Sequence, residues 1–302
     1  MACPVIRSEE AIVMITTVLD VVIAGLLLGG LYALIAMGLS LQYGVARVLN
    51  VSHGEFIMLG GLATWSLYTV FGMNPLVAIA ICAPLAFILG FILHRTMFKR
   101  LRTSSASAGV FESNSMLASF GLMFIIQNIA FVAWGPEIRG YSYLAFPVNL
   151  GGALFGANRL VTLGFALAIG LAFYVFLART RMGKAIRAAA QDPSTAGLMG
   201  VNINLVLAVC FGFGAALASI AGVLISICYP VHAAMGGEYL VIAIIVVVLG
   251  GLGSIPGSFI GGFILGILGS IVTYFQPGLA LAAYYVVFII LLLVRPTGIM
   301  GK

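Results

Sequence analysis

The sequence predicts an all-α polytopic integral membrane protein with about eight or nine transmembrane helices. Of its 302 residues, 63% are hydrophobic and only 7% are charged, whereas a soluble protein carries about 25% charged residues. The mean hydropathy is +1.21, and apolar runs of about 20 residues recur along the chain. Because lipid offers the backbone no hydrogen-bond partners, such runs are expected to be helices, and a β-barrel would show short alternating strands instead.

The whole chain, residues 1–302, is expected to form a single transmembrane domain. We predict nine apolar spans, at 20–41, 50–71, 75–94, 114–134, 160–178, 205–228, 239–252, 258–274 and 279–294. The N-terminal stretch and Gly250–Gly257 could each contain an additional half-helix. Glu9, Glu10 and Asp20 give the N-terminus the wrong charge pattern for a cleavable signal peptide.

The distribution of lysine and arginine predicts the orientation in the membrane. Placing His94–Thr103 and Arg179–Asn204 in the cytoplasm puts the N-terminus outside and the C-terminus inside. Eleven of the 14 basic residues are then cytoplasmic, namely Arg47, Arg95, Lys99, Arg100, Arg102, Arg179, Arg181, Lys184, Arg187, Arg295 and Lys302, while Arg7, Arg139 and Arg159 are outside. The net charge of +6 is therefore explained by topology and requires no nucleic-acid partner.

The loop at 179–204 is the longest stretch that cannot lie in a membrane, and it contains two helix signals. Gly183–Gln191 is rich in alanine, which favours a helix. Asp192 is followed by Pro193, an N-cap residue before a proline at the first helical position. A short second helix, Ser194–Met199, is expected to stop at Gly200.

This short helix presents small or apolar side chains on a loop that faces water. Ala196, Leu198 and Met199 are expected to form a docking surface, with Arg187 nearby. The alternative is an amphipathic helix that lies on the lipid headgroups.

Polar residues inside the spans are the candidates for a translocation path or gate. Asn50, Ser52, His53 and Glu55 open the second span near the cytoplasmic face, and Asn50 can cap that helix. We favour a structural reading, in which His53 and Glu55 pair with each other or with nearby backbone, because pairing is the usual fate of such groups in membranes. Gln127 and Asn128, in the middle of the fourth span, either bridge helices or face a path.

Three further features are interpreted as structural. His232 and Glu238 are placed in an outer loop and are expected to be solvated. The small-residue pairs Gly25/Gly29, Gly257/Gly261, Gly262/Gly266 and Ala218/Gly222 are expected to pack helices within the chain. The uncharged stretch Leu249–Ser258 is rich in glycine and is a candidate moving element as well as a turn.

No enzymatic motif is present. The sequence contains no Walker motif, nucleophile elbow, HExxH sequence or pair of catalytic carboxylates. Cys3, Cys82, Cys210 and Cys228 lack the spacing of a metal or redox site and are read as structural. We therefore expect no catalytic residues, no metal, no cofactor and no hydrolysis of ATP by this chain.

Four motifs, in order, resemble the permease subunits of bacterial branched-chain amino acid ABC importers. They are Tyr43–Gly61 (YGVARVLNVSHGEFIMLGG), the loop 183–202, Val248–Gly262 and the tail Val294–Gly301 (VRPTGIMG). The length and the ending after Pro-Thr-Gly-Ile are more similar to the H-type than to the longer M-type subunit. The first twenty residues match nothing in that pattern.

The resemblance implies an importer permease fold in a bacterial inner membrane. It implies a heterodimer with a second permease, two cytoplasmic ATPase subunits and a periplasmic binding protein. It also implies leucine, isoleucine or valine as substrate, although the same family includes importers of urea, short-chain amides and other amino acids. In such systems the loop 183–202 would couple the permease to the ATPases.

A self-sufficient secondary transporter or channel is the competing hypothesis. It would show inverted repeats and ion-coupling residues in the middle of the membrane. In the sequence we find neither a repeat nor a mid-membrane carboxylate, so we favour the ATP-driven importer.

Overall fold

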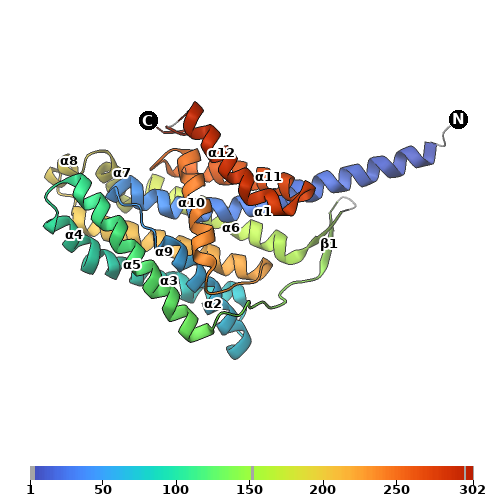
Figure 1. Ribbon diagram of the computed structural model, residues 1–302, viewed down its shortest axis with the longest axis horizontal. Helices are drawn as coiled ribbons and strands as arrows, with labels where there is room; N and C mark the ends of the chain where they lie inside the picture. The colour runs from blue at the N-terminus through green and yellow to red at the C-terminus, as the bar shows by residue number, and fades with distance from the viewer. Residues whose placement is uncertain (1–3, 151–152, 296, 302) are drawn as a thin grey trace.

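The computed structural model describes residues 4–150, 153–295 and 297–301, which form an elongated helical bundle (Figure 1). Cys3 and Lys302, considered above, lie outside the described residues. The helices are α1 (Pro4–Ala46), α2 (His53–Phe71), α3 (Pro75–Leu93), a π-helical turn (His94–Phe98), α4 (Lys99–Ser104), α5 (Ala108–Trp134), α6 (Ala157–Arg179), α7 (Arg181–Gln191), α8 (Pro193–Leu198), α9 (Ile203–Cys228), α10 (Met235–Gly250), α11 (Ile255–Phe275), a 3-10 turn (Pro277–Leu279) and α12 (Ala280–Val294).

Within the described residues, seven helices are long and apolar enough to cross a membrane: Thr16–Ala46, Pro75–Ser104, α5, α6, α9, α11 and Pro277–Val294. The predicted all-α polytopic class is confirmed. A helix lies at each of the nine predicted spans, but α10 is too short to cross alone and α2 is not among the seven. A small antiparallel hairpin, β1 (Pro147–Leu150) with β2 (Ala153–Gly156), was not predicted.

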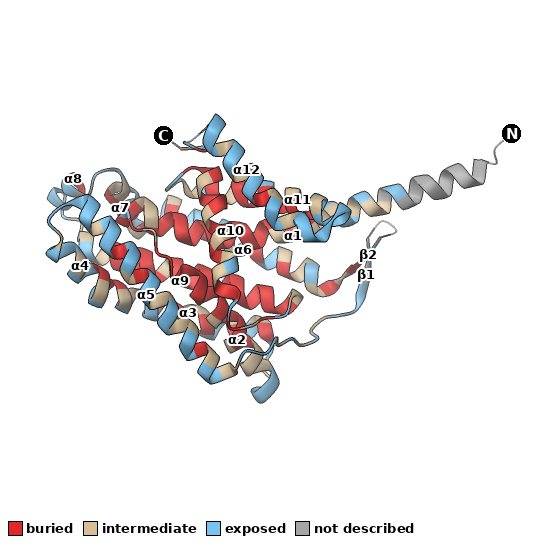
Figure 2. Cartoon of the chain, in the orientation of Figure 1, coloured by how far each residue is buried: buried red, intermediate tan, exposed pale blue. Residues whose placement is uncertain are grey.

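Helix α9 forms the centre of the bundle. In the most apolar 18-residue stretch of α9, 94% of the residues are buried, whereas only 6% are buried in Pro277–Val294, which contains α12. Figure 2 shows the same contrast, with α9 buried and α5 and α12 exposed. The exposed side chains of α5 and α12 are nevertheless mostly apolar, as expected for helices that face lipid or another subunit.

Glycines let α1 and α11 approach closely. A Cβ at Gly25 would lie 2.8 Å from the Cα of Ile267, and one at Gly29 would lie 2.7 Å from the Cα of Phe263. Gly266 faces the backbone of Gly29 in return. The predicted packing of small residues within the chain is confirmed for this pair, because backbones this close gain dispersion contacts that larger residues would prevent.

The two halves of the chain repeat one arrangement in opposite directions. Each half has a long helix, an irregular segment, a shorter helix and two further apolar helices: α1, α2, α3, α5 and α9, α10, α11, α12. The neighbours correspond as well, since α1 packs on α11 as α9 packs on α3, and α2 contacts α5 as α10 contacts α12. The expectation that the chain contains no inverted repeat is therefore wrong, because the repeat lies in the order and packing of the helices.

We call the end of the bundle where α1 ends and α9 begins the α8 end, and the opposite end the hairpin end. After α1, residues 47–52 turn back into the bundle, so that His53 Nε2 contacts the Ile35 carbonyl 3.1 Å away. Ile35 lies 11 residues before the end of α1, which is about 16 Å along a helix axis. Helix α2 therefore begins near the middle of a hydrocarbon layer about 30 Å thick.

Residues 229–234 turn back in the same way from the hairpin end. Val231 pairs with Arg139 through two backbone hydrogen bonds of 2.8 Å, and its side chain faces Gly61 of α2. Helix α10 then begins at Met235, beside the start of α2. Both short helices thus begin at mid-depth and run toward opposite ends.

The glycine-rich stretch between α10 and α11 is a tight turn, as predicted. Gly251 and Gly253 have φ values of 102° and 83°, which side chains rarely adopt. The C-terminal tail pairs with it, because Ile299 N–H donates to the Leu249 carbonyl at 2.9 Å and Met300 N–H to Gly250 at 3.0 Å.

Candidate functional site

The starts of α2 and α10 cross in the middle of the bundle. A Cβ at Gly54 would collide with the carbonyl oxygen of Gly236, and a Cβ at Gly236 would lie 2.6 Å from Glu55 Oε1. The carboxylate of Glu55 therefore lies against the first turn of α10, which carries the positive end of that helix. This arrangement, which we call the crossing, is possible only because Gly54 and Gly236 have no side chains.

A chain of buried polar groups surrounds the start of α2. Asn50 Nδ2 donates to Gln42 Oε1 at 3.2 Å, and Gln42 Nε2 donates to the Phe211 carbonyl at 3.3 Å. Ser52 donates from both its N–H and its hydroxyl to Asn50 Oδ1. Asn50 therefore closes a turn before the helix rather than capping it, and Ser52 takes the N-cap position.

His53 and Glu55 are both buried but do not pair with each other. His53 bonds the backbone of α1, while His53 Nδ1 and Glu55 Oε2 have no hydrogen-bond partner among the described residues. The structural reading thus holds for the backbone contact of His53 but not for a His53–Glu55 pair. The expected position near the cytoplasmic face is also wrong, because the turn back at 47–52 carries both residues to mid-depth.

Gln127 and Asn128 are not brought to the crossing. Asn128 is exposed on α5, and its amide donates to the Phe124 carbonyl of its own helix at 2.8 Å. Gln127 is half-buried. On α5 it is Ser119, which the sequence did not single out, that reaches the polar chain, since its hydroxyl accepts from Val51 N–H at 3.1 Å.

Glu238 is a second correction. It was expected in a solvated outer loop, but it lies in the first turn of α10, at the crossing. One sequence signal could have revealed it: Gly54-Glu55-Phe56 and Gly237-Glu238-Tyr239 both read Gly-Glu-aromatic, and each starts one of the two short helices.

At the α8 end, the corner between α7 and α8 forms as predicted. Asp192 Oδ1 accepts hydrogen bonds from Ser194 N–H at 2.9 Å and Thr195 N–H at 3.2 Å. These bonds, together with those from the Ser194 and Thr195 hydroxyls, hold the pKa of Asp192 well below its usual value. Pro193 occupies the first helical position, and Gly200 ends the turn with φ 86°.

The apolar side chains of α8 divide into two groups. Leu198 and Met199 are 87% and 81% exposed, whereas Ala196 is buried within the chain. The expected docking role of Ala196 is therefore wrong, because its side chain is covered by other residues of this chain. Helix α7 buries Ile186 and Ala189 and contacts α1 and α9, while Arg187 donates to the Ala178 carbonyl at 3.1 Å.

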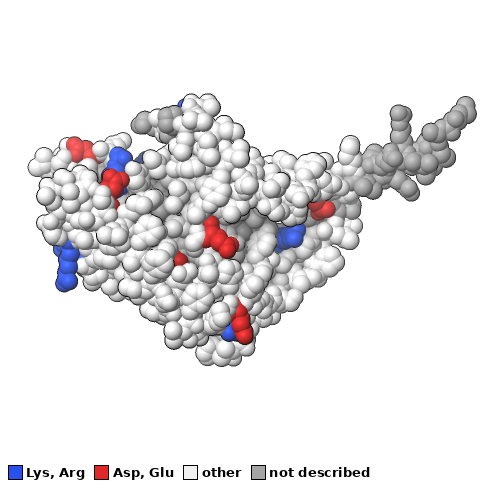
Figure 3. Space-filling model, viewed as in Figure 1, with Lys and Arg blue, Asp and Glu red and all other residues white. Residues whose placement is uncertain are grey.

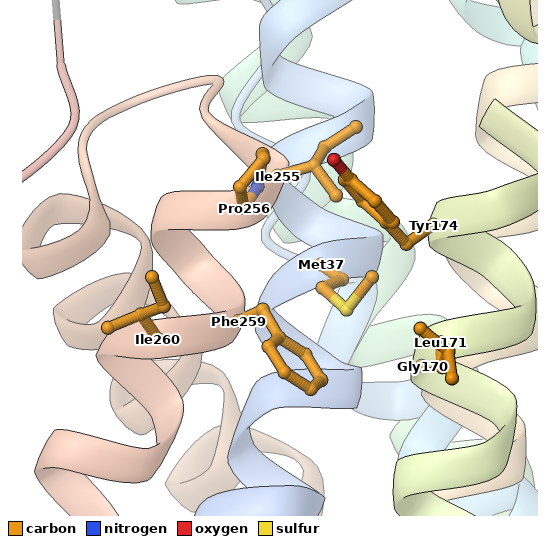
Figure 4. Close-up of a pocket in the computed structure, with 8 residues that line it drawn as sticks. All are labelled: Met37, Gly170, Leu171, Tyr174, Ile255, Pro256, Phe259 and Ile260. Carbon is orange, nitrogen blue, oxygen red and sulfur yellow. The ribbon is translucent and has the colours of Figure 1, made fainter. Parts of the chain in front are cut away.

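Two cavities lie near these elements. At the α8 end, a cavity of about 540 Å³ is lined by Arg47, Arg102, Glu112 and Pro193, among others, so it joins α8 to the ends of α1 and α4. A second cavity of about 240 Å³ lies between α1, α6 and α11 (Figure 4). Apart from the Tyr174 hydroxyl the side chains in its wall are apolar, so this cavity offers a ligand no oppositely charged partner.

Potential metal ligands do not gather in the described part of the chain, where no group of three His, Cys, Asp or Glu side chains could hold an ion.

Comparison with known proteins places these features in a family. Residues 21–295 match the family model described as "Branched-chain amino acid transport system / permease component". The chain is 30% identical over 298 residues to the high-affinity branched-chain amino acid transport system permease protein LivH of Escherichia coli, covering 92% of this chain and 94% of that protein. It is 27% identical to BraD, the corresponding permease protein of Pseudomonas aeruginosa, covering 94% and 96%.

Among solved structures, PsaBC from Streptococcus pneumoniae in complex with Fab superposes with a TM-score of 0.48 at 14% identity, covering 91% of each chain. The family match spans the apolar helices, the crossing and the α7–α8 corner together. Since it covers far more than half of the sequence, this multi-pass membrane protein belongs to the family of branched-chain amino acid transport permease components.

Proposed function

We propose that this chain is the permease subunit of an ATP-driven importer of branched-chain amino acids. It forms one half of the translocation path, beside a second permease, and works with two cytoplasmic ATPase subunits and a periplasmic binding protein. The α8 end faces the cytoplasm of a bacterial inner membrane. The observation that carries this proposal is the capped α7–α8 corner with Leu198 and Met199 exposed at its tip.

The corner is suited to transmit motion. Its direction is fixed by Asp192 and Pro193 before any partner binds, and a preset geometry lowers the ordering cost of docking. Leu198 and Met199 enter a groove of an ATPase, and Arg187 attracts an acidic rim. When ATP draws the ATPases together, α8 moves with them. Helix α7 then shifts α1 and α9, on which it packs.

The path is opened and closed at the crossing. Helix α9 packs on α2, α1 packs on α10, and His53 of α2 bonds to the Ile35 carbonyl of α1, so a tilt of either long helix changes how the two short helices meet. Asn50, Ser52, His53 and Glu55 hold the start of α2 in place and act as a gate support. Gln127 and Asn128 are less suited to a path role, because they lie apart from this cluster.

Reconstitution tests the function. The chain, its neighbouring permease, the two ATPases and the binding protein are incorporated into liposomes, and uptake of labelled leucine, isoleucine and valine is measured. We expect uptake that requires both ATP and the binding protein. ATP-dependent uptake of urea or a short-chain amide in place of these amino acids would contradict the substrate, and uptake without ATPases would favour a secondary transporter.

Cysteine labelling tests the orientation. Lys184 and Arg139 lie at opposite ends of the bundle and are exposed and half-buried, respectively. In intact spheroplasts, an impermeant thiol reagent should label Arg139→Cys and leave Lys184→Cys unlabelled until the membrane is permeabilised. Labelling of position 184 from outside would overturn the proposed topology.

A further inference from the structure

We infer that Glu238 lines the translocation path at mid-membrane depth and binds the ammonium group of the amino acid that passes. This inference rests on the proposed function and names a residue that contacts substrate within it. Four observations support it: the depth of Glu238, its exposure, the absence of a partner, and its relation to Glu55.

The depth follows from the crossing. Gly236 lies against Gly54 and Glu55, and α2 begins beside Ile35 of α1 and Gly38, which itself faces Gly214 of α9. Gly214 lies 11 residues into α9, about 16 Å from its start. Glu238 is two residues beyond Gly236, so it lies within about 3 Å of that level. It is therefore far from either membrane surface.

The side chain of Glu238 is nevertheless exposed on the surface of this chain. Among the described residues it forms no hydrogen bond or ion pair. An ionised carboxylate at this depth cannot face acyl chains without a large cost, so it marks a surface that faces water or protein. Helix α10 crosses the middle of the view in Figure 1, and Figure 3 shows isolated acidic atoms on the middle of that face, among uncharged ones.

The buried counterpart of Glu238 explains why a cation is the ligand. Glu55 occupies the equivalent position in the first half, and its carboxylate already lies against the positive end of α10, with Oε2 unpartnered. The start of α10, which favours a negative group, is therefore already occupied by a carboxyl group of this chain. Glu238 places a second carboxyl group nearby, and the charge of this exposed group attracts a positive group rather than the carboxylate of the substrate.

An amino acid crosses the membrane as a zwitterion, and its ammonium group needs a carboxylate at the centre of the membrane. Removing an ammonium from water is costly unless it meets an opposite charge or several acceptors. A carboxylate at mid-depth supplies this contact where no lipid headgroup or bulk water can, and releases the substrate when the gate moves.

The experiment uses the complete complex in liposomes and in nanodiscs. Glu238→Gln keeps the shape and removes the charge. We expect it to lower the initial rate of leucine uptake by about tenfold or more, the usual effect of losing a charged hydrogen bond. Glu238→Asp should keep part of the rate, and assembly and ATPase activity without binding protein should stay unchanged. The control is Glu137→Gln, which removes an exposed carboxylate at the hairpin end.

Thiol accessibility tests the placement without requiring transport. In nanodiscs, Glu238→Cys should react with a cationic, membrane-impermeant methanethiosulfonate faster than Leu171→Cys, whose parent side chain is 62% exposed midway along α6. The unsubstituted chain gives the background from its four cysteines, of which Cys82 and Cys210 are buried and Cys228 is half-buried.

Three outcomes overturn the inference. If wild-type complexes import leucine and Glu238→Gln does so at the same rate, Glu238 does not bind the substrate. If Glu238→Gln fails to assemble, the carboxylate pairs with a cation of the second permease instead. If Glu238→Cys reacts with lipid-soluble maleimide alone, it faces lipid. Should the wild-type complex import no leucine, the proposed substrate fails, and the accessibility result still decides whether Glu238 lines a path.

Discussion

The α7–α8 corner and the crossing of α2 and α10 are both interruptions in a helical membrane protein, but they are held in different ways. At the corner, Asp192, Pro193 and Gly200 act within a few residues of each other. At the crossing, Gly54 meets Gly236 across 182 positions of sequence. The capped corner can be predicted from neighbouring residues in the sequence, whereas a contact between distant residues depends on the whole fold.

The two regions also differ in what they expose. The corner presents apolar Leu198 and Met199 to solvent, while the α2 side of the crossing buries the polar His53 and Glu55 inside the bundle. Both regions reverse the usual placement of side chains, because apolar groups are ordinarily buried and polar groups ordinarily exposed. Such reversals indicate sites that serve something besides stability, and the following changes should separate a docking role from a gating role.

The largest effect is expected for Leu198→Glu. If Leu198 enters an ATPase groove, the new carboxylate is buried without a partner at a cost of several kcal/mol, so leucine uptake and substrate-stimulated ATPase activity should fall at least about a hundredfold. Membrane insertion and substrate capture by the binding protein should persist. Gln191→Glu adds the same charge at an exposed position of α7 and is the control. Wild-type uptake by Leu198→Glu would exclude α8 as the coupling helix.

At the crossing, two matched glycines should behave differently. Gly54→Ala places a methyl group against the Gly236 carbonyl, whereas Gly237→Ala, at the equivalent position of the second half, meets nothing within 4 Å. We expect overpacking at Gly54 to cost about 1–3 kcal/mol, seen as a lower unfolding temperature in detergent, and Gly237→Ala to be nearly neutral. Equal effects of the two changes would mean that the crossing is not closely packed.

Much of the fold could be predicted because a membrane helix is a local property. Each of the nine apolar runs contains a helix, and the caps at Asp192 and Gly200 need no distant partner. The depth of His53 and Glu55 could not be predicted, because it depends on residues 47–52 turning back along α1. The burial of Ala196 could not be predicted for a similar reason, because it depends on how α8 packs against the rest of the chain.

The inverted arrangement also corrects how the competing hypothesis was judged. Its absence from the sequence was taken to oppose a secondary transporter, yet the halves do correspond in space, and Glu55 lies at mid-depth. Neither feature separates the two classes. The family match identifies a permease component of a transport system, and the requirement for ATP in the reconstitution experiment is what separates an ATP-driven importer from a secondary transporter.

A moderate effect is expected for Glu55→Gln. If the Glu55 carboxylate stabilises the positive end of α10, its neutral replacement should lower stability by about 0.3–2 kcal/mol, the range for a favourable charge at a helix N-terminus. The relative uptake of leucine, isoleucine and valine should not change, since the Glu55 side chain is buried within this chain and does not reach the substrate. The thermal stability of the purified complex and the three uptake ratios give the answer, and an altered ratio at unchanged stability would make Glu55 a substrate contact.

The smallest effect is expected at the cap of α8, and it sharpens the contrast between a cap made by neighbouring residues and a crossing made by distant ones. Ser194 and Thr195 donate to Asp192 and hold its pKa below the usual value. A carboxylate with a lowered pKa in the folded state stabilises the fold above its unfolded pKa and loses this effect only as pH falls through the lowered value. Substrate-stimulated ATPase activity should thus not depend on the titration of Asp192 between about pH 5 and 8.

Asp192→Ala should reduce substrate-stimulated ATPase activity by about twofold to fivefold, as loss of an N-cap does. Asp192→Asn keeps an acceptor and should reduce it less. If Asn and Ala were equally impaired, charge rather than capping would be what Asp192 contributes, and Asp192 would itself be a contact with the ATPase.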